Sequence, residues 1–227
     1  MTQTEKHSTW RYRSPFMRVS KFVARWLFLK PALTTQLSLR AHGRDELNQV
    51  DQKRAFIVAS NHTSHLDGVI VMKELPWRLA RRISTASAAD FWFKSRLRSL
   101  PVRILMNTFP VERSETNRHK GLAGQLLENN IPLMIMPEGS RSRTGAMGKF
   151  KPGAAALAIK YDIPIIPAAI VGAFEAWPPG KKMWKAGRPK VTINFGKPLS
   201  PKPGETVEQF NKRLRSAVAK LYNQKRT

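Results

Sequence analysis

Two side chains suited to acid-base chemistry, His62 and Asp67, lie five residues apart. The apolar run from Ala55 to Ser60 predicts a buried strand that ends just before His62, and Asp67 falls near the start of a predicted helix. Sites in α/β proteins form where strands end. If the Asp67 carboxylate accepts a hydrogen bond from Nδ1 of His62, Nε2 is left as a base that can remove the proton of a hydroxyl.

This spacing alone is a weak signal, because an aspartate that caps a helix beside a surface histidine gives the same pattern. His65 is the alternative base, but Asp67 is then only two residues away, a poor arrangement for side chains that must face each other. A hydrolase with Ser64 as nucleophile is the nearest rival enzyme. Against it, the sequence has no Gly-X-Ser-X-Gly motif, and Gly145 to Lys149 also lacks the pattern of a P-loop.

Two further segments place an arginine after an apolar run. Arg113 ends the segment from Phe109, and Arg141 lies in the segment Met136 to Ser142. Two guanidinium groups at one edge of a sheet can clamp a phosphate through forked, charge-assisted hydrogen bonds. The alternative for each is an ordinary solvated charge, since the chain has 40 Lys and Arg residues.

Taken together, these segments resemble the glycerolipid acyltransferases, the family of the bacterial 1-acylglycerol-3-phosphate acyltransferase. Asn61 to Asp67 resembles the family's His-X4-Asp motif. Its second, third and fourth blocks are similar, in order, to Phe109 to Arg113, Pro137 to Ser142 and Ile163 to Pro167. The resemblance covers residues 37 to 200. It implies acyl transfer from a thioester, acyl-CoA or acyl carrier protein, to a hydroxyl, with no metal, no other cofactor and no covalent acyl-enzyme.

The resemblance also implies roles for individual residues. His62 is the general base, Asp67 orients it, and Arg113 binds the acceptor phosphate. The residues that shape the acceptor site are Glu138, Gly139, Ser140 and Arg141. The region associated with the acyl donor comprises Ile163, Pro164, Ile165, Ile166 and Pro167. The chain departs from the family's usual residues at Asn107, Pro110, Glu112 and Ser140. Lysophosphatidate is the first choice of acceptor, and another lysolipid, glycerol-3-phosphate or a glycolipid is the alternative.

The elements that must position these residues alternate along the chain. Apolar runs predict strands at Leu37 to Ala41, Ala55 to Ser60, Ile104 to Val111, Leu133 to Met136, Ile163 to Ile170 and Val191 to Phe195. Helices are expected at Gly68 to Leu75, Asp90 to Leu100, Asn117 to Asn129, Pro152 to Lys160 and Thr206 to Tyr222. The alternation predicts one α/β domain, residues 37–227, with a mixed, largely parallel sheet flanked by helices.

Residues 1–36 are predicted to form a separate, basic membrane-association region. Between Phe16 and Leu33 the apolar residues recur at helical spacing, while Arg18, Lys21 and Arg25 fall largely on another face. Such a helix lies in the headgroup layer, where anionic lipids attract its basic residues. The alternative is a helix packed on the protein's own core, because periodicity does not distinguish the two environments.

Charge and composition narrow the classes of function. The net charge of +25 indicates a polyanionic partner, either anionic lipid or nucleic acid. A nucleic-acid-binding protein is the remote alternative, and since no zinc-finger or RNP-like motif supports it, we expect no nucleic-acid partner. The absence of cysteine excludes thiol nucleophiles and Cys-ligated metals. No run approaches the roughly 20 apolar residues that cross a bilayer, so we expect peripheral, monotopic binding to the cytoplasmic face of a membrane.

Overall fold

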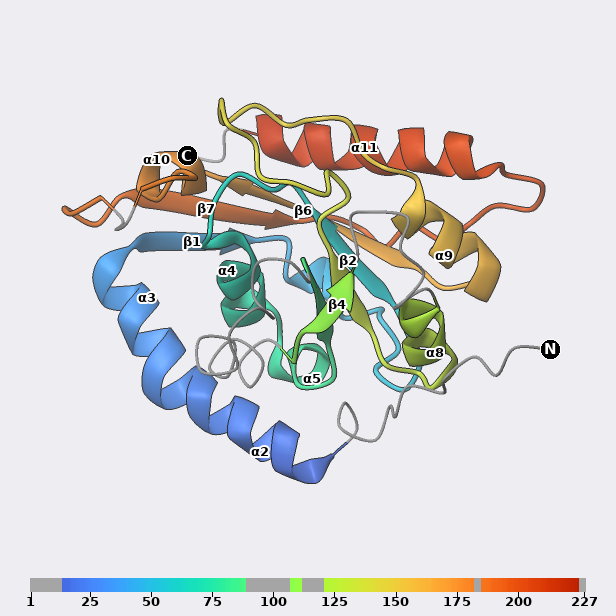
Figure 1. Cartoon of the computed structure of the whole chain (residues 1–227), viewed down its shortest axis with the longest axis horizontal. Coiled ribbons are helices and arrows are strands. Elements are labelled where there is room, and N and C mark those ends of the chain that lie inside the picture. Colours follow the sequence, from blue (N-terminus) through green and yellow to red (C-terminus); the bar gives the residue numbers. More distant parts are fainter. Residues whose placement is uncertain (1–13, 89–106, 112–120, 182–184, 225–227) are drawn as a thin grey trace.

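A computed structural model describes residues 14–88, 107–111, 121–181 and 185–224. Among these residues one seven-stranded sheet forms the centre (Figure 1). Its strands are β1 (Ser38–His42), β2 (Ile57–Ser60), β3 (Ser84–Ala88), β4 (Phe109–Val111), β5 (Leu133–Ile135), β6 (Ile165–Val171) and β7 (Lys190–Phe195). They lie in the order β1-β7-β6-β2-β5-β3-β4, and every pair is parallel except β6 with β7. The prediction of a mixed, largely parallel sheet is confirmed.

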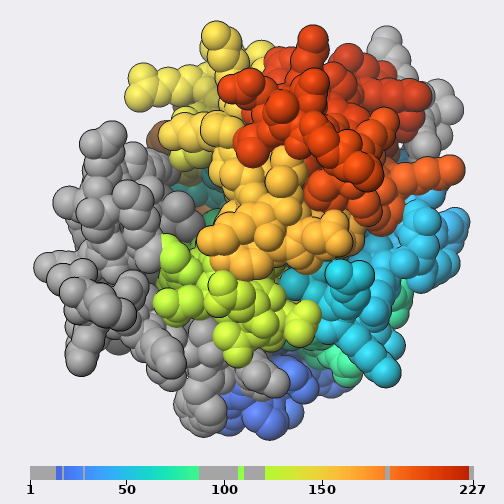
Figure 2. Space-filling model, turned by 90° about the vertical axis from the view of Figure 1, so that its right-hand side faces the viewer, coloured from blue at the N-terminus to red at the C-terminus, as the bar shows by residue number. Residues whose placement is uncertain are grey.

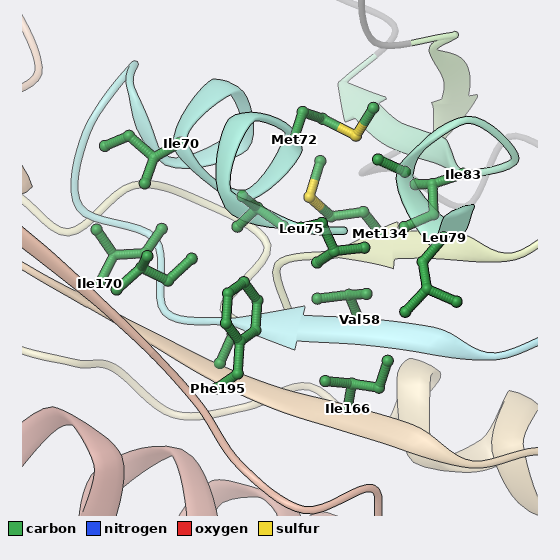
Figure 3. Packing of buried hydrophobic residues seen from close by; sticks show 14 of the residues in the cluster. Val58, Ile70, Met72, Leu75, Leu79, Ile83, Met134, Ile166, Ile170 and Phe195 are labelled. Atoms are coloured by element: carbon green, nitrogen blue, oxygen red, sulfur yellow. The ribbon is translucent and has the colours of Figure 1, made fainter. Parts of the chain in front are cut away.

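Helices cover both faces of the sheet, because successive side chains of a strand point to opposite sides. One face carries α4 (Asp67–Glu74), α5 (Trp77–Ala80) and α10 (Ala173–Ala176). The other carries α8 (Leu122–Glu128), α9 (Gly153–Tyr161) and α11 (Val207–Asn223), seen together in Figure 2. In the first core, Val58, Ile166 and Phe195 of three neighbouring strands face Ile70 of α4 and Leu79 of α5 (Figure 3). These two cores fix the strand ends that carry the site.

All six predicted strands are present where the structure describes them, and four of the predicted helices correspond to α4, α8, α9 and α11. The predicted helix Asp90 to Leu100 lies outside the described residues, as do residues 104–106 and 117–120. Strand β3 and the short helices α5, α10 and η2 (Asp45–Leu47) were not predicted. Strand β3 reads Ser-Thr-Ala-Ser-Ala, which has no apolar run, and it is held by pairing with β4 and β5.

The predicted N-terminal helix is also present, as α2 (Pro15–Val23), a π-helical segment η1 (Ala24–Leu29) and α3 (Lys30–Gln36). Two of its basic residues point into the protein. Nζ of Lys21 donates to the carbonyl of Ile83 at 2.5 Å, and Nη2 of Arg25 donates to the carbonyls of Lys73 and Leu75, both at 2.7 Å. Arg25 thereby satisfies carbonyls that the C-terminal end of α4 leaves without helical partners. These hydrogen bonds attach the helix to the domain.

The apolar side of this helix is exposed. Phe16 is 75% exposed, Leu27 66% and Val19 61%, and Phe22, Val23 and Trp26 are also exposed. Leu29 and Leu33 join the core beneath α4. The apolar residues of the last turns therefore pack on the protein, as the alternative expects, whereas an apolar surface remains at the first turns. Among the described residues no helix is long and apolar enough to cross a membrane.

The buried Lys21 gives the fold a pH dependence. Burial lowers the pKa of Lys21 to about 7 from its usual 10.5, with a smaller contribution from Arg18. Between these two pH values the unfolded chain binds more protons at Lys21 than the folded protein does. Stability therefore rises with pH across this window, by up to about 1.4 kcal/mol per pH unit.

We predict that Lys21→Met removes this rise. The free energy of urea unfolding, measured for both proteins from pH 7 to pH 10, should increase with pH more steeply in the wild type than in the variant. Subtracting the two curves cancels the contributions of all other titrating groups. Parallel curves would show that Lys21 is not buried in this way.

Candidate active site

Asp67 is the buried centre of the site. It is the first residue of α4, and its Oδ2 accepts hydrogen bonds from Nδ1 of His62 at 2.8 Å and from the backbone N–H groups of Thr63 at 2.7 Å and Ser64 at 2.8 Å. A carboxylate at a helix N-terminus is also stabilised by the helix dipole. The predicted contact between His62 and Asp67 is present. When Nδ1–H donates to Asp67, the lone pair is on Nε2. No described residue donates a hydrogen bond to this Nε2.

The backbone of His62 is held from the loop after β5. Oε1 of Glu138 accepts from the His62 N–H at 2.8 Å, and the Ser142 N–H donates to the His62 carbonyl at 2.8 Å. Oε2 of Glu138 accepts from the Gly148 N–H at 2.9 Å, which closes the loop on itself. Burial raises the pKa of Glu138, although both backbone hydrogen bonds act to lower it. Glu138 therefore positions the turn that bears His62. The position of Glu138 in the sequence does not suggest its hydrogen bond to the His62 backbone.

Arg141 lies against His65. Its Nη1 is 2.6 Å from Nδ1 of His65 and also contacts Nε2, and the ring of Trp177 lies 5.1 Å from the imidazole, centroid to centroid. Burial lowers the pKa of His65, and the charge of Arg141 lowers it as well. A neutral imidazole is the form that can accept from a guanidinium. His65 contacts Arg141, whereas the hydrogen bond to Asp67 belongs to His62, which favours His62 as the base.

Ser64 does not fit the rival role of nucleophile. Its side chain is fully buried, and its Oγ donates to the carbonyl of Trp177 at 2.7 Å. This hydrogen bond joins the turn after β2 to the segment that follows α10. Within the part of the chain that the structure describes, no imidazole nitrogen accepts from this hydroxyl. The arrangement supports a structural role for Ser64.

The loop that carries Arg141 lines an open cavity of about 350 Å³. It is lined by Glu138, Ser140, Arg141, Ser142, Thr144, Ala146, Met147, Gly148 and Lys149. Gly139 begins this loop with a φ of 74°, a conformation that glycine adopts without strain, and a Cβ there would lie 3.0 Å from Cε of Lys151. Two cations and several hydroxyls make the cavity suitable for a phosphate. Glu138, Gly139, Ser140 and Arg141 are thus brought together beside His62.

The second block is described only in part. Arg113 lies outside the described residues, so its predicted contact with an acceptor phosphate stays a prediction. Asn107, which stands where many family members have glycine, has a φ of 47° and is held by a hydrogen bond from Nδ2 to Oγ of Ser84 at 3.0 Å. Asparagine tolerates this left-handed conformation better than most residues. Pro110 lies in β4, where an edge strand can accept proline.

The fourth block leads into β6, which begins at Ile165. Ile163, Ile165, Ile166 and Pro167 are buried, and Pro167 pairs with Ala59 of β2. Pro164 is half-buried. The association of this block with the acyl donor stays a prediction. The buried side chains of the block offer no surface that the donor could contact directly. Any effect on the donor must come from the position of β6 beside the strand that carries His62.

Sequence reasoning missed three residues that build the site. Asn61 binds both backbone groups of Ile170, with Nδ2 donating at 2.9 Å and Oδ1 accepting at 2.8 Å, and so ties the end of β2 to β6. Ser142 and Trp177 act through the contacts above. The sequence does offer a sign of the role of Asn61, because a polar residue directly after a buried strand needs hydrogen-bond partners. Among the described residues, no cluster of three or more His, Asp or Glu side chains could hold a metal ion.

Comparison with known proteins finds an acyltransferase family model and similar acyltransferases. A model of the acyltransferase family matches residues 38–171. The probable 1-acyl-sn-glycerol-3-phosphate acyltransferase of Mycoplasma genitalium is 23% identical over 220 residues, covering 91% of this chain and 77% of that protein. The 1-acyl-sn-glycerol-3-phosphate acyltransferase of Cocos nucifera is 26% identical over 158 residues, covering 68% of this chain and 48% of that protein. The chain thus spans about half the length of this plant relative.

A solved structure has the same fold. The crystal structure of the 1-acyl-sn-glycerophosphate (LPA) acyltransferase, PlsC, from Thermotoga maritima matches 96% of this chain and 92% of that chain. Its TM-score is 0.71 at 21% sequence identity. The likeness extends over the sheet and the helices described above.

The hydrogen bonds of Glu138 lead to a testable prediction. Glu138→Ala leaves the N–H groups of His62 and Gly148 without their acceptor, so the imidazole should shift and kcat for acyl transfer should fall by about 10²-fold. Glu138→Gln keeps one acceptor oxygen, so its kcat should fall less than that of Glu138→Ala. The KM for the acceptor should change little in both variants. Steady-state kinetics, with the exposed Glu208→Gln as the control for charge loss, checks this.

A rise in acceptor KM at unchanged kcat would contradict this positioning role. It would favour the sequence-based expectation that Glu138 shapes the acceptor site itself.

Proposed function

This chain belongs to the acyltransferase family, and we propose that it moves a fatty acyl group from an acyl thioester to the hydroxyl of 1-acylglycerol-3-phosphate. The product is then phosphatidate, an intermediate of phospholipid biosynthesis. The similar proteins of Mycoplasma genitalium and Cocos nucifera, both named as 1-acyl-sn-glycerol-3-phosphate acyltransferases, support this acceptor. The donor is acyl-CoA or acyl carrier protein, which is a co-substrate and not a bound cofactor. Another lysolipid, glycerol-3-phosphate or a glycolipid remains the alternative acceptor.

The observation that carries the proposal is the hydrogen bond between His62 and Asp67 beside the cavity with Arg141. His62 Nε2 takes the proton of the acceptor hydroxyl as its oxygen attacks the thioester carbonyl carbon. The tetrahedral intermediate collapses, the C–S bond breaks, and the thiolate takes the proton back from Nε2. The products are an ester and a free thiol. A cation near the acceptor phosphate holds the hydroxyl in line with the carbonyl.

Two arginines are proposed to bind the acceptor phosphate. Arg141 lines the cavity, and His65 accepts from its guanidinium, which fixes one end of that side chain. Arg113 is the second, by resemblance to the family's second block. Ser140 and Lys149 line the same cavity and supply further donors. Forked donors on arginine match the oxygen atoms of a phosphate, which suits an acceptor that carries one.

The N-terminal helices are proposed to bind the membrane from the cytoplasmic face, without crossing it. An exposed apolar surface on α2 and η1, which includes Phe16, Val19 and Leu27, supports this. Exposed apolar side chains that lie together on one helix face mark an interaction surface. Residues 1–36 would then act as a membrane-association region joined to the catalytic residues 37–227. Placement at a lipid surface fits an acceptor that resides there.

His62→Ala is expected to lower kcat by about 10²- to 10⁴-fold, the contribution of a general base, with the melting temperature little changed. Transfer of labelled acyl groups to 1-acylglycerol-3-phosphate in detergent measures this. His65→Asn is the matched comparison, because it changes the neighbouring imidazole. A larger loss with His65→Asn than with His62→Ala would make His65 the base.

The membrane proposal predicts that Phe16→Ser with Leu27→Ser weakens binding to neutral phosphatidylcholine vesicles by roughly 100-fold, since each side chain loses its apolar burial in lipid. Flotation of vesicles measures it. The exchanged pair Phe16→Leu with Leu27→Phe keeps the apolar surface and should bind like the wild type. Equal flotation of all three proteins would remove these residues from the membrane contact.

A further inference from the structure

A second cavity, also of about 350 Å³, lies far from His62 in the fold. Among the described residues it is lined by Arg18, Lys53, Arg82, Glu128, Asn129, Asn130 and Ile131. Lys53 precedes β2, Arg82 precedes β3 and Ile131 precedes β5, and these three strands run parallel. The cavity therefore lies at the amino ends of the strands, whereas His62 follows a carboxyl end. It is not part of the active site.

The charge in this cavity is unbalanced. Arg82 donates to the carbonyls of Lys53 and Asn130, so its charge offsets the carbonyl-rich end of α8. The side chains of Arg18 and Lys53 have no hydrogen-bond or ion-pair partner among the described residues. Glu128 is the single acidic residue among those that line the cavity, and it accepts from the hydroxyl of Tyr161 at 3.2 Å. Two unpaired cations on one cavity repel each other, and an anion bound between them would relieve that repulsion.

The position of Arg18 on α2 favours one kind of anion as the ligand of this cavity. At 3.6 residues per turn, Arg18 falls on α2 between Phe22, on the exposed apolar side, and the buried Lys21. Figure 2 shows α2, in blue, below α8 in yellow-green, with the cyan segment to the right of α8. The cavity itself is lined by cations and polar groups, and the exposed apolar side of α2 begins at Phe22, one helical turn from Arg18. This combination matches a phospholipid, whose phosphate adjoins its acyl chains.

We propose that this cavity binds the phosphate of an anionic phospholipid, whose acyl chains lie along the apolar side of α2. Arg18 and Lys53 contact the phosphate, and Arg82 supports the cavity wall. The inference rests on the proposal that the N-terminal helices lie at a lipid surface. It adds a specific lipid contact to the diffuse attraction that a charge of +25 produces. This lipid is a structural ligand and not the acceptor.

The test is binding of the full chain to a short-chain phosphatidylglycerol that is soluble as a monomer, measured by calorimetry. Arg18→Gln with Lys53→Gln should weaken binding by roughly 30-fold, from about five-fold for each cation near the phosphate. Glu128→Gln should strengthen binding, because it removes the carboxylate from the cavity. Lys212→Gln with Lys220→Gln is the matched control on exposed positions of α11 and should leave binding unchanged. Acyl transfer in detergent should be unaltered in all of these variants.

A variant without charge change separates a built site from general attraction. Asn129→Trp fills the cavity and should abolish lipid binding, whereas Asn129→Ala should not. If the α11 control weakens binding as much as the cavity pair, the attraction is diffuse and the inference is overturned. If inorganic phosphate binds as tightly as the lipid, the site takes free anions and the lipid assignment is overturned. If the wild-type protein transferred no acyl groups in detergent, the proposed function would be refuted instead, since transfer in detergent does not depend on this cavity.

Discussion

The site depends on one buried carboxylate. Asp67 is fully buried, and three donors converge on one of its oxygens, two of them backbone N–H groups of the turn that begins at His62. A buried carboxylate is costly unless it is hydrogen-bonded, so this turn can adopt few other conformations. The same contacts set the orientation of the imidazole and the start of α4. The geometry of the proposed catalytic pair and the local fold therefore depend on the same hydrogen bonds.

A second constraint comes from the loop after β5. Glu138 and Ser142 bind the two backbone polar groups of His62, so the loop that carries Arg141 is fixed relative to the imidazole of His62. A phosphate in the cavity of this loop would therefore lie at a defined position relative to Nε2. Such positioning contributes much of the rate in reactions between two bound substrates. The N-terminal helix adds a further link, since Arg25 holds the opposite end of α4.

How much of this could be predicted follows from the range of each interaction. The contact of His62 with Asp67 is local, between a strand end and the next helix, and the sequence predicts it correctly. The partners of Glu138 lie 76 and 10 residues away and are backbone groups, which no side-chain pattern reveals. Lys21 and Arg25 suggested a lipid-facing surface, yet they bind carbonyls of the domain. Strand β3 was missed because pairing with its neighbours, and not an apolar run, makes it a strand.

The central claim is that Asp67 makes His62 a base. Asp67→Asn keeps the size of the side chain but places an amide where an acceptor of three hydrogen bonds is required. The decisive measurement is the single-turnover rate of acyl transfer to 1-acylglycerol-3-phosphate by Asp67→Asn, with its melting temperature recorded alongside. We expect a folded protein whose rate is lower by on the order of 10²- to 10⁴-fold. A folded variant that transfers acyl groups at the wild-type rate would contradict it.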